Sequence, residues 1–410
     1  MKKKIAILID LELNYKAGGH VKFWERIAYS LKGNKLDFDL TLFFLGNTNC
    51  IKRINDNINF QILKPILSSK ILTKFGIDAD STDLSPLNLR LLFKLRNFNL
   101  IHTTDQLFAM SKTASIASKI WNIPLTTSFH TDTPSYTEYY VLNILNKLPS
   151  LIKEFFINRV KLHEWISNNQ KKKILRYINK CKFAFVNDSF SREQMKFLKG
   201  CKIKIDKISR GIDKKVFFKK KLDKNKFLKR FKINENNQII FFCGRIHSLK
   251  GAVLLAEIQK ILNNKNTKVI TVMAGENIHG DLCKRICKDN LKILDYLSPD
   301  DVSNFYNICD LFVFPSLYET GPQVVMEARA CGAICVVSKL GGGKRIKKSG
   351  YDGIILNSQK TGEWVIEIEK LLNNSQKANL MQKKVLELAK YLSWEEIFTK
   401  IFLRKWKLLF

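Results

Sequence analysis

Residues 311–332 read LFVFPSLYETGPQVVMEARACG and join a short apolar run to a helix-forming segment. The apolar run at 311–316 has the length and composition of a buried strand. Thr320 and Gln323 form a Thr-x-x-Gln pattern, which predicts a capping box at the start of a helix, and Gly332 is placed to end that helix. A strand that leads directly into a helix is the repeating unit of α/β folds with parallel sheets.

The same alternation of apolar runs and helix-period segments continues along the whole chain, which predicts two parallel sheets. At 410 residues the chain also exceeds what one hydrophobic core usually supports. We expect two Rossmann-like domains at 1–207 and 223–392, a linker at 208–222 and an amphipathic helix at 393–410. The expected strands are 5–10, 39–45, 100–103, 125–129, 183–187, 239–245, 269–275, 291–294, 311–316 and 334–338.

The charge of the chain is strongly positive, with 70 Lys and Arg against 37 Asp and Glu and a net charge of +33. This favours an anionic partner such as nucleic acid, a membrane surface or a phosphorylated substrate. The alternative is a genome biased toward Lys, Asn and Ile, which would explain the lysines but not the shortage of acids. A nucleic-acid-binding protein would need an interleaved basic and aromatic face or a helix-turn-helix, and neither is found, so we expect no nucleic-acid partner.

The cysteines and the apolar segments indicate a cytoplasmic protein. The nine cysteines include no CxxC pair, so reduced thiols are expected, with a zinc site as the alternative. The start, MKKKIAILIDLEL, has the basic residues of a leader peptide, but Asp10 interrupts its apolar run and a first strand is the better interpretation. The sequence contains no run of about 18 apolar residues, so we expect no membrane-spanning helix.

Candidate chemistry lies where expected strands end, because open α/β sheets bind ligands at that edge. The helix expected after residue 320 offers free N–H groups to a phosphate. Glu319 and Glu327 flank this helix start, and carboxylates suit sugar hydroxyls. The alternative is that Glu319 caps a neighbouring backbone and Glu327 faces solvent.

The segment GRIHSLKG (244–251) places Arg245 and Lys250 just after another expected strand. Two cations there would neutralise a diphosphate leaving group without a metal ion. The alternative is that they are ordinary surface cations of a Lys-rich chain.

Two segments of the first half follow strands in the same way. HTDTP (130–134) brings His130 and Asp132 to the sheet edge, although a lone histidine is more often structural. GGH (18–20) is a short glycine turn after the first strand and suits close approach of a phosphate or sugar.

Together these motifs resemble those of GT-B glycosyltransferases, and within them the retaining enzymes of family 4. The family pattern of Glu, seven residues, Glu and then Ala-x-Ala-x-Gly appears as ETGPQVVMEARACG (319–332), and its GR-x4-KG pattern as GRIHSLKG (244–251). RGID (210–213) and the final SWEE helix are also similar. The resemblance covers nearly the whole chain and implies the α/β GT-B fold, with two Rossmann-like domains facing across a cleft and a final helix crossing back to the N-terminal domain.

The resemblance also implies roles for individual residues. Glu327 would hold the donor ribose, Glu319 the transferred sugar, and His130 would line the sugar site. No metal ion and no cofactor are implied. The implied catalytic residues are His130, Arg245, Lys250 and Glu319. The implied donor-binding residues are Gly18, Gly19, Arg245, Lys250, Glu319, Gly321, Gln323, Val324 and Glu327.

The function implied is metal-independent, retaining transfer of a hexose-type sugar from a nucleotide-diphosphate donor. A lipid-linked or cell-envelope glycan would accept the sugar on the N-terminal domain, and the C-terminal domain would bind the donor. Pro322 departs from the family pattern and lacks an N–H, which leaves open a catalytically impaired scaffold. Sugar-nucleotide epimerases and phosphorylases share this fold and also stay open. The Asp78-Ala-Asp80 pattern is similar to the metal-binding acids of the other glycosyltransferase fold, but it follows no buried strand.

The segment 143–182 suggests a membrane surface, because it carries ten Lys or Arg against two acids. The hypothesis is peripheral binding to the inner face of the cytoplasmic membrane. HTDTPSYTEYY (130–140) is similar to the motif of family members that glycosylate lipids. The alternative is an amphipathic helix that covers the core. The apolar residues at helical spacing are Ile144, Leu148, Leu151, Phe155, Leu162 and Trp165.

Overall fold

The chain divides into two compact units in a computed structural model, which describes residues 2–14, 17–71, 81–188, 190, 195–265, 268–317, 319, 321–357 and 360–410. Unit 1 comprises Met1–Ser209 and Trp394–Phe410, and unit 2 comprises Arg210–Ser393. The linker expected at 208–222 does not form a separate unit. Residues up to Ser209 belong to unit 1, and Arg210 and the residues after it belong to unit 2. The Asp78-Ala-Asp80 pattern lies outside the described residues.

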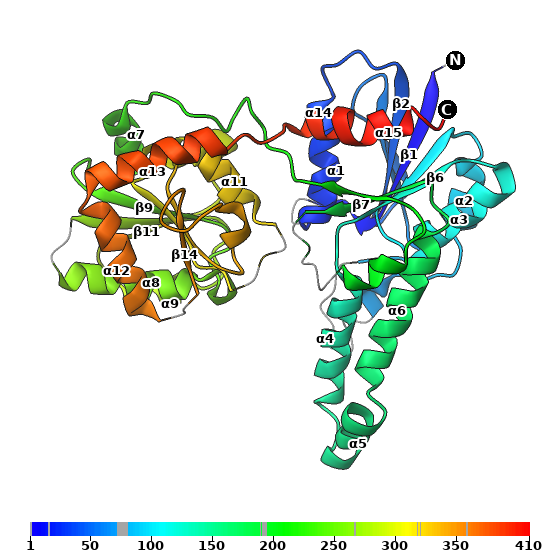
Figure 1. The fold of residues 1–410 in the computed structure, drawn as a ribbon, viewed down its shortest axis with the longest axis horizontal. Helices are drawn as coiled ribbons and strands as arrows, with labels where there is room; N and C mark the ends of the chain where they lie inside the picture. The colour runs from blue at the N-terminus through cyan, green and yellow to red at the C-terminus, as the bar shows by residue number, and fades with distance from the viewer. Residues whose placement is uncertain are drawn as a thin grey trace. The chain divides into compact units, whose positions relative to one another are not determined.

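The described part of unit 1 is built on an eight-stranded sheet in the order β3-β4-β2-β1-β5-β6-β7-β8 (Figure 1). All neighbouring strands are parallel except β3, which runs antiparallel to β4. The strands are β1 (Lys3–Glu12), β2 (Phe38–Leu45), β3 (Cys50–Arg53), β4 (Ile58–Leu63), β5 (Leu100–Thr103), β6 (Leu125–Phe129), β7 (Phe183–Asn187) and β8 (Ile205–Ile208).

Helices flank this sheet, and two of them, α4 and α6, extend away from it (Figure 1). Among the described residues, no helix combines the length and apolar character needed to cross a bilayer. The helices of unit 1 are α1 (Gly19–Ser30), α2 (Leu89–Leu95), α3 (Ala109–Trp121), α4 (Thr133–Leu145), α5 (Ser150–Glu154), η2 (Phe155–Arg159), α6 (Leu162–Ile178), η3 (Lys196–Gly200), α14 (Trp394–Ile397), η6 (Phe398–Leu403) and α15 (Arg404–Trp406).

The final helical segment, α14 to α15, belongs to unit 1, although the residues of unit 2 separate it from the rest of unit 1 in the sequence. Its buried aromatic residues pack into the N-terminal core. The ring of Phe402 lies 4.9 Å from that of Trp24 on α1 and 4.7 Å from that of Phe185 on β7. Such aromatic pairs add favourable edge and face contacts to the area that they bury. The final helical segment therefore contributes to the core of unit 1.

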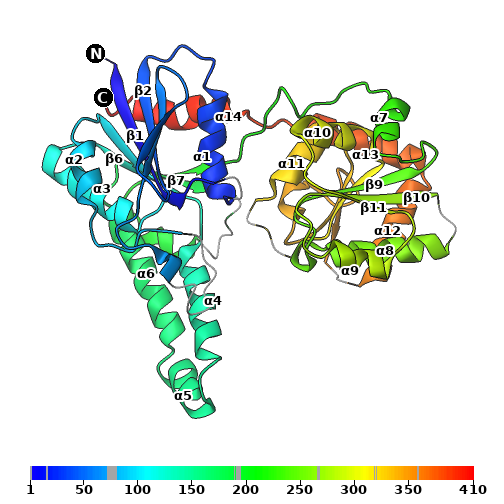
Figure 2. The same ribbon diagram turned by 180° about the vertical axis from the view of Figure 1, so that it is seen from behind.

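Unit 2 contains a six-stranded sheet in the order β11-β10-β9-β12-β13-β14, in which every described pair is parallel (Figure 2). The strands are β9 (Gln238–Cys243), β10 (Val269–Ala274), β11 (Leu291–Leu294), β12 (Leu311–Phe314), β13 (Cys335–Ser338) and β14 (Ile354–Leu356). The helices are α7 (Lys224–Arg230), η4 (Ser248–Lys250), α8 (Ala252–Asn264), α9 (Gly280–Ile286), α10 (Pro299–Ile308), α11 (Gln323–Ala330), η5 (Gly343–Arg345), α12 (Thr361–Leu372) and α13 (Ser375–Leu388).

All ten strands expected from the sequence are present, which confirms the two parallel α/β sheets. The sequence did not predict β3, β4, β8 and β14. All four residues of β3 are exposed, so this strand has no apolar run to reveal it. The strands β8 and β14 have only 4 and 3 residues and lie at sheet edges.

The start of α11 differs from the expected capping box, whereas its end is as expected. The helix begins at Gln323 with Pro322 as N-cap, and Thr320 lies outside the described residues. The Gln323 side chain donates to the carbonyl of Gly211, 2.7 Å away. It therefore makes this contact in place of the one that a capping box would give it. At the other end, the N–H groups of Gly332 and Ala333 bond to the carbonyls of Arg329 and Ala328, a Schellman motif.

A buried ion pair ties α11 to the loop before β14. The guanidinium of Arg329 lies 2.8 Å from the carboxylate of Asp352, and the two side chains are 2% and 0% exposed. The same guanidinium donates to the Tyr391 hydroxyl and the Asp352 carbonyl. Removing one member of such a pair leaves a buried charge without its counter-ion, which costs more than the pair contributes.

Replacing Arg329 by Met is expected to lower the free energy of unfolding of unit 2 by about 3–5 kcal/mol in urea, because Asp352 then stays buried and uncompensated. Lys265→Met is the matched control, since Lys265 forms a 2.7 Å pair with Glu369 at the surface. That change should cost at most about 1 kcal/mol. Equal losses for the two variants would contradict this account of the buried pair.

Candidate functional site

The site in unit 2 lies where the strand order reverses. β9 and β12 are neighbours in the sheet, but the chain between them runs outward through β10 and β11. Open α/β sheets bind ligands at the carboxyl ends of strands at such a switch point. The segment after β9 contains Arg245 and Lys250, and the segment after β12 contains Glu319. The fold therefore brings three of the four expected catalytic residues to one edge.

Lys250 and Glu319 meet directly across this switch point. The Lys250 ammonium lies 2.5 Å from a carboxylate oxygen of Glu319, and both side chains are partly buried. The Ser316 hydroxyl donates to the same oxygen over 3.3 Å. Glu319 therefore forms a charge-assisted contact with a residue 69 positions away, and the alternative that it only caps a neighbouring backbone is not supported.

Close backbone packing fixes this pair. A Cβ on Gly251, where φ is +80°, would lie 2.4 Å from the Pro315 carbonyl oxygen, and one on Gly341 would lie 2.4 Å from the Ser316 carbonyl oxygen. The N–H of Leu317 bonds to the carbonyl of Leu249 over 3.0 Å. Side chains at the two glycine positions would force these segments apart. The segments after β9, β12 and β13 therefore pack against one another and form one continuous surface.

Glu327 is a buried helix residue, only 6% exposed, so the alternative that it faces solvent is wrong. It lies on the second turn of α11, close to Cys243 at the end of β9. Burial and then the negative charge of Glu327 raise the pKa of the Cys243 thiol to about 12. Burial, Cys243 and Glu327 also raise the pKa of Tyr306. The carboxylate is therefore held at the same edge as Lys250 and Glu319.

The loop after β9 is a cationic surface. Arg245 is exposed, and the ring of His247 stacks on that of His279 with centroids 4.3 Å apart. Burial and the positive charges of His279, Arg245 and Lys250 lower the pKa of His247. Because the positive charges of this loop already disfavour protonation of His247, the loop is suited to an anionic ligand.

The N-terminus of α11 lies beside these residues and contains Gly321, Gln323 and Val324 of the expected donor set. Pro322 precedes the first helical residue, so the helix is intact although Pro322 itself cannot donate an N–H. Gln323 and Val324 occupy the first turn, where backbone N–H groups lack partners within the helix. The first turn of α11 therefore retains donors for a phosphate despite Pro322.

In unit 1, the structure brings His130 and the glycine turn together. Gly18 is the N-cap of α1 and Gly19 its first residue, and both are exposed. The ring of His20, the next residue, stacks on that of His130 with centroids 4.7 Å apart and planes 12° apart. His20 also lies 2.7 Å from the Thr104 hydroxyl, at the end of β5. Gly18, Gly19 and His130 thus share the switch point of this sheet, between β1 and β5.

A chain of hydrogen bonds links His130 to the core of unit 1. The Ser128 hydroxyl lies 2.8 Å from Nε2 of His130 and 2.9 Å from Nε2 of His102. Burial lowers the pKa of His102 well below its usual value, so this ring is neutral near pH 7. Sequence reasoning gave His20 only as the last residue of the GGH turn, and it missed His102 and Ser128, because their contact joins two different strands.

Asp132 has a structural role. Its carboxylate caps α4 by accepting from the N–H and hydroxyl of Ser135, at 3.4 and 2.7 Å. Because this cap engages its carboxylate, Asp132 is a weaker candidate for ligand contact than His130.

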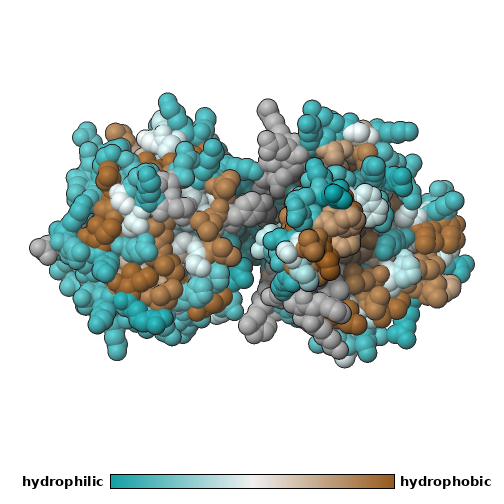
Figure 3. Space-filling view, turned by 90° about the horizontal axis from the view of Figure 1, so that it is seen from below, coloured by the Kyte–Doolittle hydropathy of each residue, from teal (hydrophilic) through white to brown (hydrophobic). Residues whose placement is uncertain are grey.

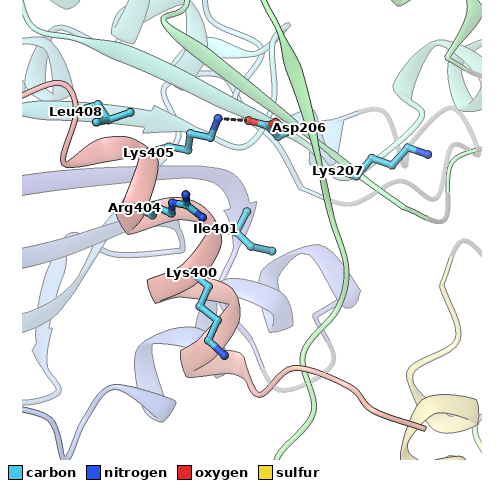
Figure 4. A pocket seen from close by; sticks show the side chains of 7 residues that line it. All are labelled: Asp206, Lys207, Lys400, Ile401, Arg404, Lys405 and Leu408. Atoms are coloured by element: carbon cyan, nitrogen blue, oxygen red, sulfur yellow. Dashed lines mark ion pairs between the residues drawn. The ribbon is translucent and has the colours of Figure 1, made fainter. Parts of the chain in front are cut away.

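A pocket elsewhere in unit 1 contains none of the expected site residues. It has a volume of about 470 Å³ and lies between β8 and the final helical segment (Figure 4). Asp206 forms a 3.0 Å pair with Lys405 across it, which neutralises one of its four cations. Its lining residues come from β8 and the final helical segment and not from the segments that follow β1, β5, β9 or β12, so the switch points remain the candidate site. The lining residues are Asp206, Lys207, Lys400, Ile401, Arg404, Lys405 and Leu408.

Within the described ranges, no group of three or more His, Cys, Asp or Glu side chains is arranged to hold a metal ion. All nine cysteines are free thiols, and six of them are buried. Burial raises the pKa of Cys335 to about 12 and that of Cys331 to about 11, which keeps these thiols protonated and unreactive.

Comparison with curated proteins finds glycosyltransferases. The chain is 27% identical over 201 residues to a D-inositol 3-phosphate glycosyltransferase of Segniliparus rotundus, covering 47% of this chain and 44% of that one. It is 29% identical over 181 residues to a lipopolysaccharide 1,2-N-acetylglucosaminetransferase of Salmonella typhimurium, covering 40% and 47%. The matches thus span less than half the length of these relatives.

Comparison with solved structures supports the fold over the whole length. HepE of Anabaena, solved in complex with UDP and glucose, superposes with a TM-score of 0.67 at 17% identity and covers 99% of each chain. The family described as glycosyl transferases group 1 matches residues 223–387, which include every expected site residue of unit 2. Residues 223–387 therefore form a group 1 glycosyl transferase domain, in a chain with the two-domain α/β fold of GT-B glycosyltransferases.

Proposed function

We propose that this chain is a retaining glycosyltransferase that moves a hexose-type sugar from a nucleotide-diphosphate donor to a lipid-linked or cell-envelope glycan. The observation that carries the proposal is the contact between Lys250 and Glu319 at the switch point of a group 1 glycosyl transferase domain. That edge combines a cationic loop, a helix N-terminus and two fixed carboxylates. The cationic loop and the helix N-terminus suit a diphosphate. The two carboxylates suit the hydroxyl groups of the ribose and of the sugar.

Unit 2 binds the donor in this proposal. Arg245 and Lys250 bind the diphosphate, and the first turn of α11 donates N–H groups to it. Glu327 accepts hydrogen bonds from ribose hydroxyls, and Glu319 from hydroxyls of the transferred sugar. Because an ammonium has three N–H donors, Lys250 can keep its contact with Glu319 and still donate to a phosphate oxygen.

Unit 1 binds the acceptor and supplies His130 to the transferred sugar. In the reaction, the bond between the sugar C1 and the leaving phosphate oxygen breaks, and a bond to the acceptor oxygen forms on the same face. The acceptor proton passes to the leaving phosphate, so the nucleoside diphosphate departs protonated and no enzymic nucleophile is used. Arg245 and Lys250 stabilise the negative charge of the leaving group, a role that does not require a metal ion.

One relative supports the acceptor class, and one solved structure supports the donor class. The Salmonella relative acts on lipopolysaccharide according to its name, and HepE was solved with UDP and glucose. A cytoplasmic enzyme that binds the inner face of the membrane peripherally would meet a lipid-linked glycan there. The basic segment 143–182 is the feature of this chain that supports such binding.

The proposal is tested by adding UDP-, GDP- and ADP-sugars to the purified protein and measuring the melting temperature. A donor that binds only the folded state raises the melting temperature by mass action. Transfer from the stabilising donor to a detergent-solubilised lipid-linked acceptor is then assayed, and NMR of the product shows whether the anomeric configuration is retained. If none of the donors raises the melting temperature or supports transfer, the proposal fails.

Replacing Glu327 by Gln keeps the shape of the side chain but removes its charge. We expect kcat/KM for transfer to fall about 10- to 100-fold, because a hydrogen bond to a charged group contributes about 1.5–3 kcal/mol. Glu257→Gln is the control, since the Glu257 carboxylate on α8 accepts from Thr361 over 2.9 Å, away from the switch point. Wild-type turnover in Glu327→Gln would refute the donor-site assignment.

Replacing His130 by Gln tests the role of unit 1 separately. We expect kcat to fall about 10- to 100-fold while the dissociation constant of the nucleoside diphosphate stays unchanged, because His130 acts on the sugar and not on the nucleotide. His163→Gln, a buried histidine of α6, controls for general effects of losing an imidazole. A parallel loss of nucleotide affinity in His130→Gln would contradict this division of roles.

A further inference from the structure

Unit 1 carries a helical hairpin that leads away from its sheet. α4 and α6 pack along each other, and both Figure 1 and Figure 2 show α5 at the far end of the pair. Pro149 opens α5, which continues into η2. Residues 149–160 form the hairpin tip. The amphipathic segment expected at 143–182 is therefore not one helix lying over the core but a hairpin with a separate tip.

The hairpin tip is apolar and uncovered. The described residues of α5 and η2 include no buried side chain. Leu151 is 82% exposed, and Ile152 and Phe155 are about half exposed. Trp165, one turn into α6, is 63% exposed. Figure 3 views unit 1 with the tip toward the reader and shows hydrophobic surface there, bordered by hydrophilic residues.

The same region is strongly basic. Lys147, Lys153, Arg159 and Lys161 lie at or beside the tip, against Glu154 within it and Glu164 beside it, whose carboxylate lies 4.0 Å from the Lys161 ammonium. Large apolar side chains beside basic ones are typical of helices that lie in the headgroup layer of a bilayer. A second copy of the hairpin would bring like charge against this tip, whereas anionic lipid headgroups carry the opposite charge. Charge complementarity thus favours lipid over self-association.

We propose that the hairpin tip is a membrane wedge, which inserts Leu151, Ile152 and Phe155 among the headgroups of an anionic bilayer. The flanking Lys and Arg side chains bind the lipid phosphates. This deepens the proposed function and rests on it in one respect, namely that docking would place the enzyme where a lipid-linked acceptor is found. The docking itself needs neither donor nor acceptor.

The first test is co-sedimentation of the full chain with vesicles of phosphatidylcholine alone or mixed with phosphatidylglycerol. We expect binding to the anionic vesicles only, weakened by salt. The variant Leu151→Asp/Phe155→Asp should bind at least tenfold more weakly. The matched control is Ile366→Asp/Leu380→Asp, which places the same charges on two exposed apolar positions of unit 2 and should bind as the wild type does.

The second test uses Trp165, since the other five tryptophans are buried or partly buried. Anionic vesicles that contain brominated lipid should quench Trp165 emission, and the quenching should disappear in Trp165→Phe. Charge reversal of Lys147 and Lys153 to Glu should weaken vesicle binding about fivefold or more per residue.

The wedge is refuted if the wild type stays in the supernatant with both kinds of vesicle, or if Leu151→Asp/Phe155→Asp binds as tightly as the control variant. A wild-type dimer that this double variant converts to a monomer, without vesicle binding, would assign the tip to self-association instead. Stabilisation by the donor and sugar transfer in detergent need no bilayer. If both are observed while vesicle binding is absent, only the wedge is refuted. If both are absent while vesicle binding is observed, the proposed function is refuted and the wedge is not.

Discussion

Backbone contact between three loops of unit 2 is the constraint on which the candidate site depends. Gly251 lies against the Pro315 carbonyl and Gly341 against the Ser316 carbonyl, so the segments after β9, β12 and β13 pack without side chains between them. The Leu317 N–H bonds to the Leu249 carbonyl, and the Glu319 N–H to the Leu340 carbonyl, both at 3.0 Å. With the backbone held in this way, Lys250 and Glu319 meet with little freedom to separate.

This arrangement has a consequence for ligand binding. A charged pair at the end of a parallel sheet is already partly desolvated, so less solvent reorganisation is needed when a charged ligand arrives. The cationic loop around Arg245 favours anions, whereas Glu319 and the buried Glu327 restrict anionic groups to one part of the surface. The site is therefore polarised, with a basic side for phosphates and an acidic side for hydroxyl groups.

The sequence predicted the elements that have a local signature. Apolar runs located all ten expected strands, and Gly332 marked the end of α11. Contacts between distant segments could not be predicted from the sequence. The capping box was wrong, since α11 begins at Gln323 with Pro322 as its N-cap, and the Gln323 side chain donates to Gly211, 112 residues away. The pairing of Lys250 with Glu319, and the link from His130 through Ser128 to His102, likewise depend on strand order, which spacing alone does not reveal.

Hydrogen exchange measured by mass spectrometry, with and without the nucleoside diphosphate that stabilises the protein, tests the central claim most directly. The account predicts slower exchange in peptides that cover 244–251 and 316–327, because the ligand would bind the N–H groups of these loops and of the first turn of α11. Protection confined to 205–208 and 400–408, around the pocket of Figure 4, would contradict it.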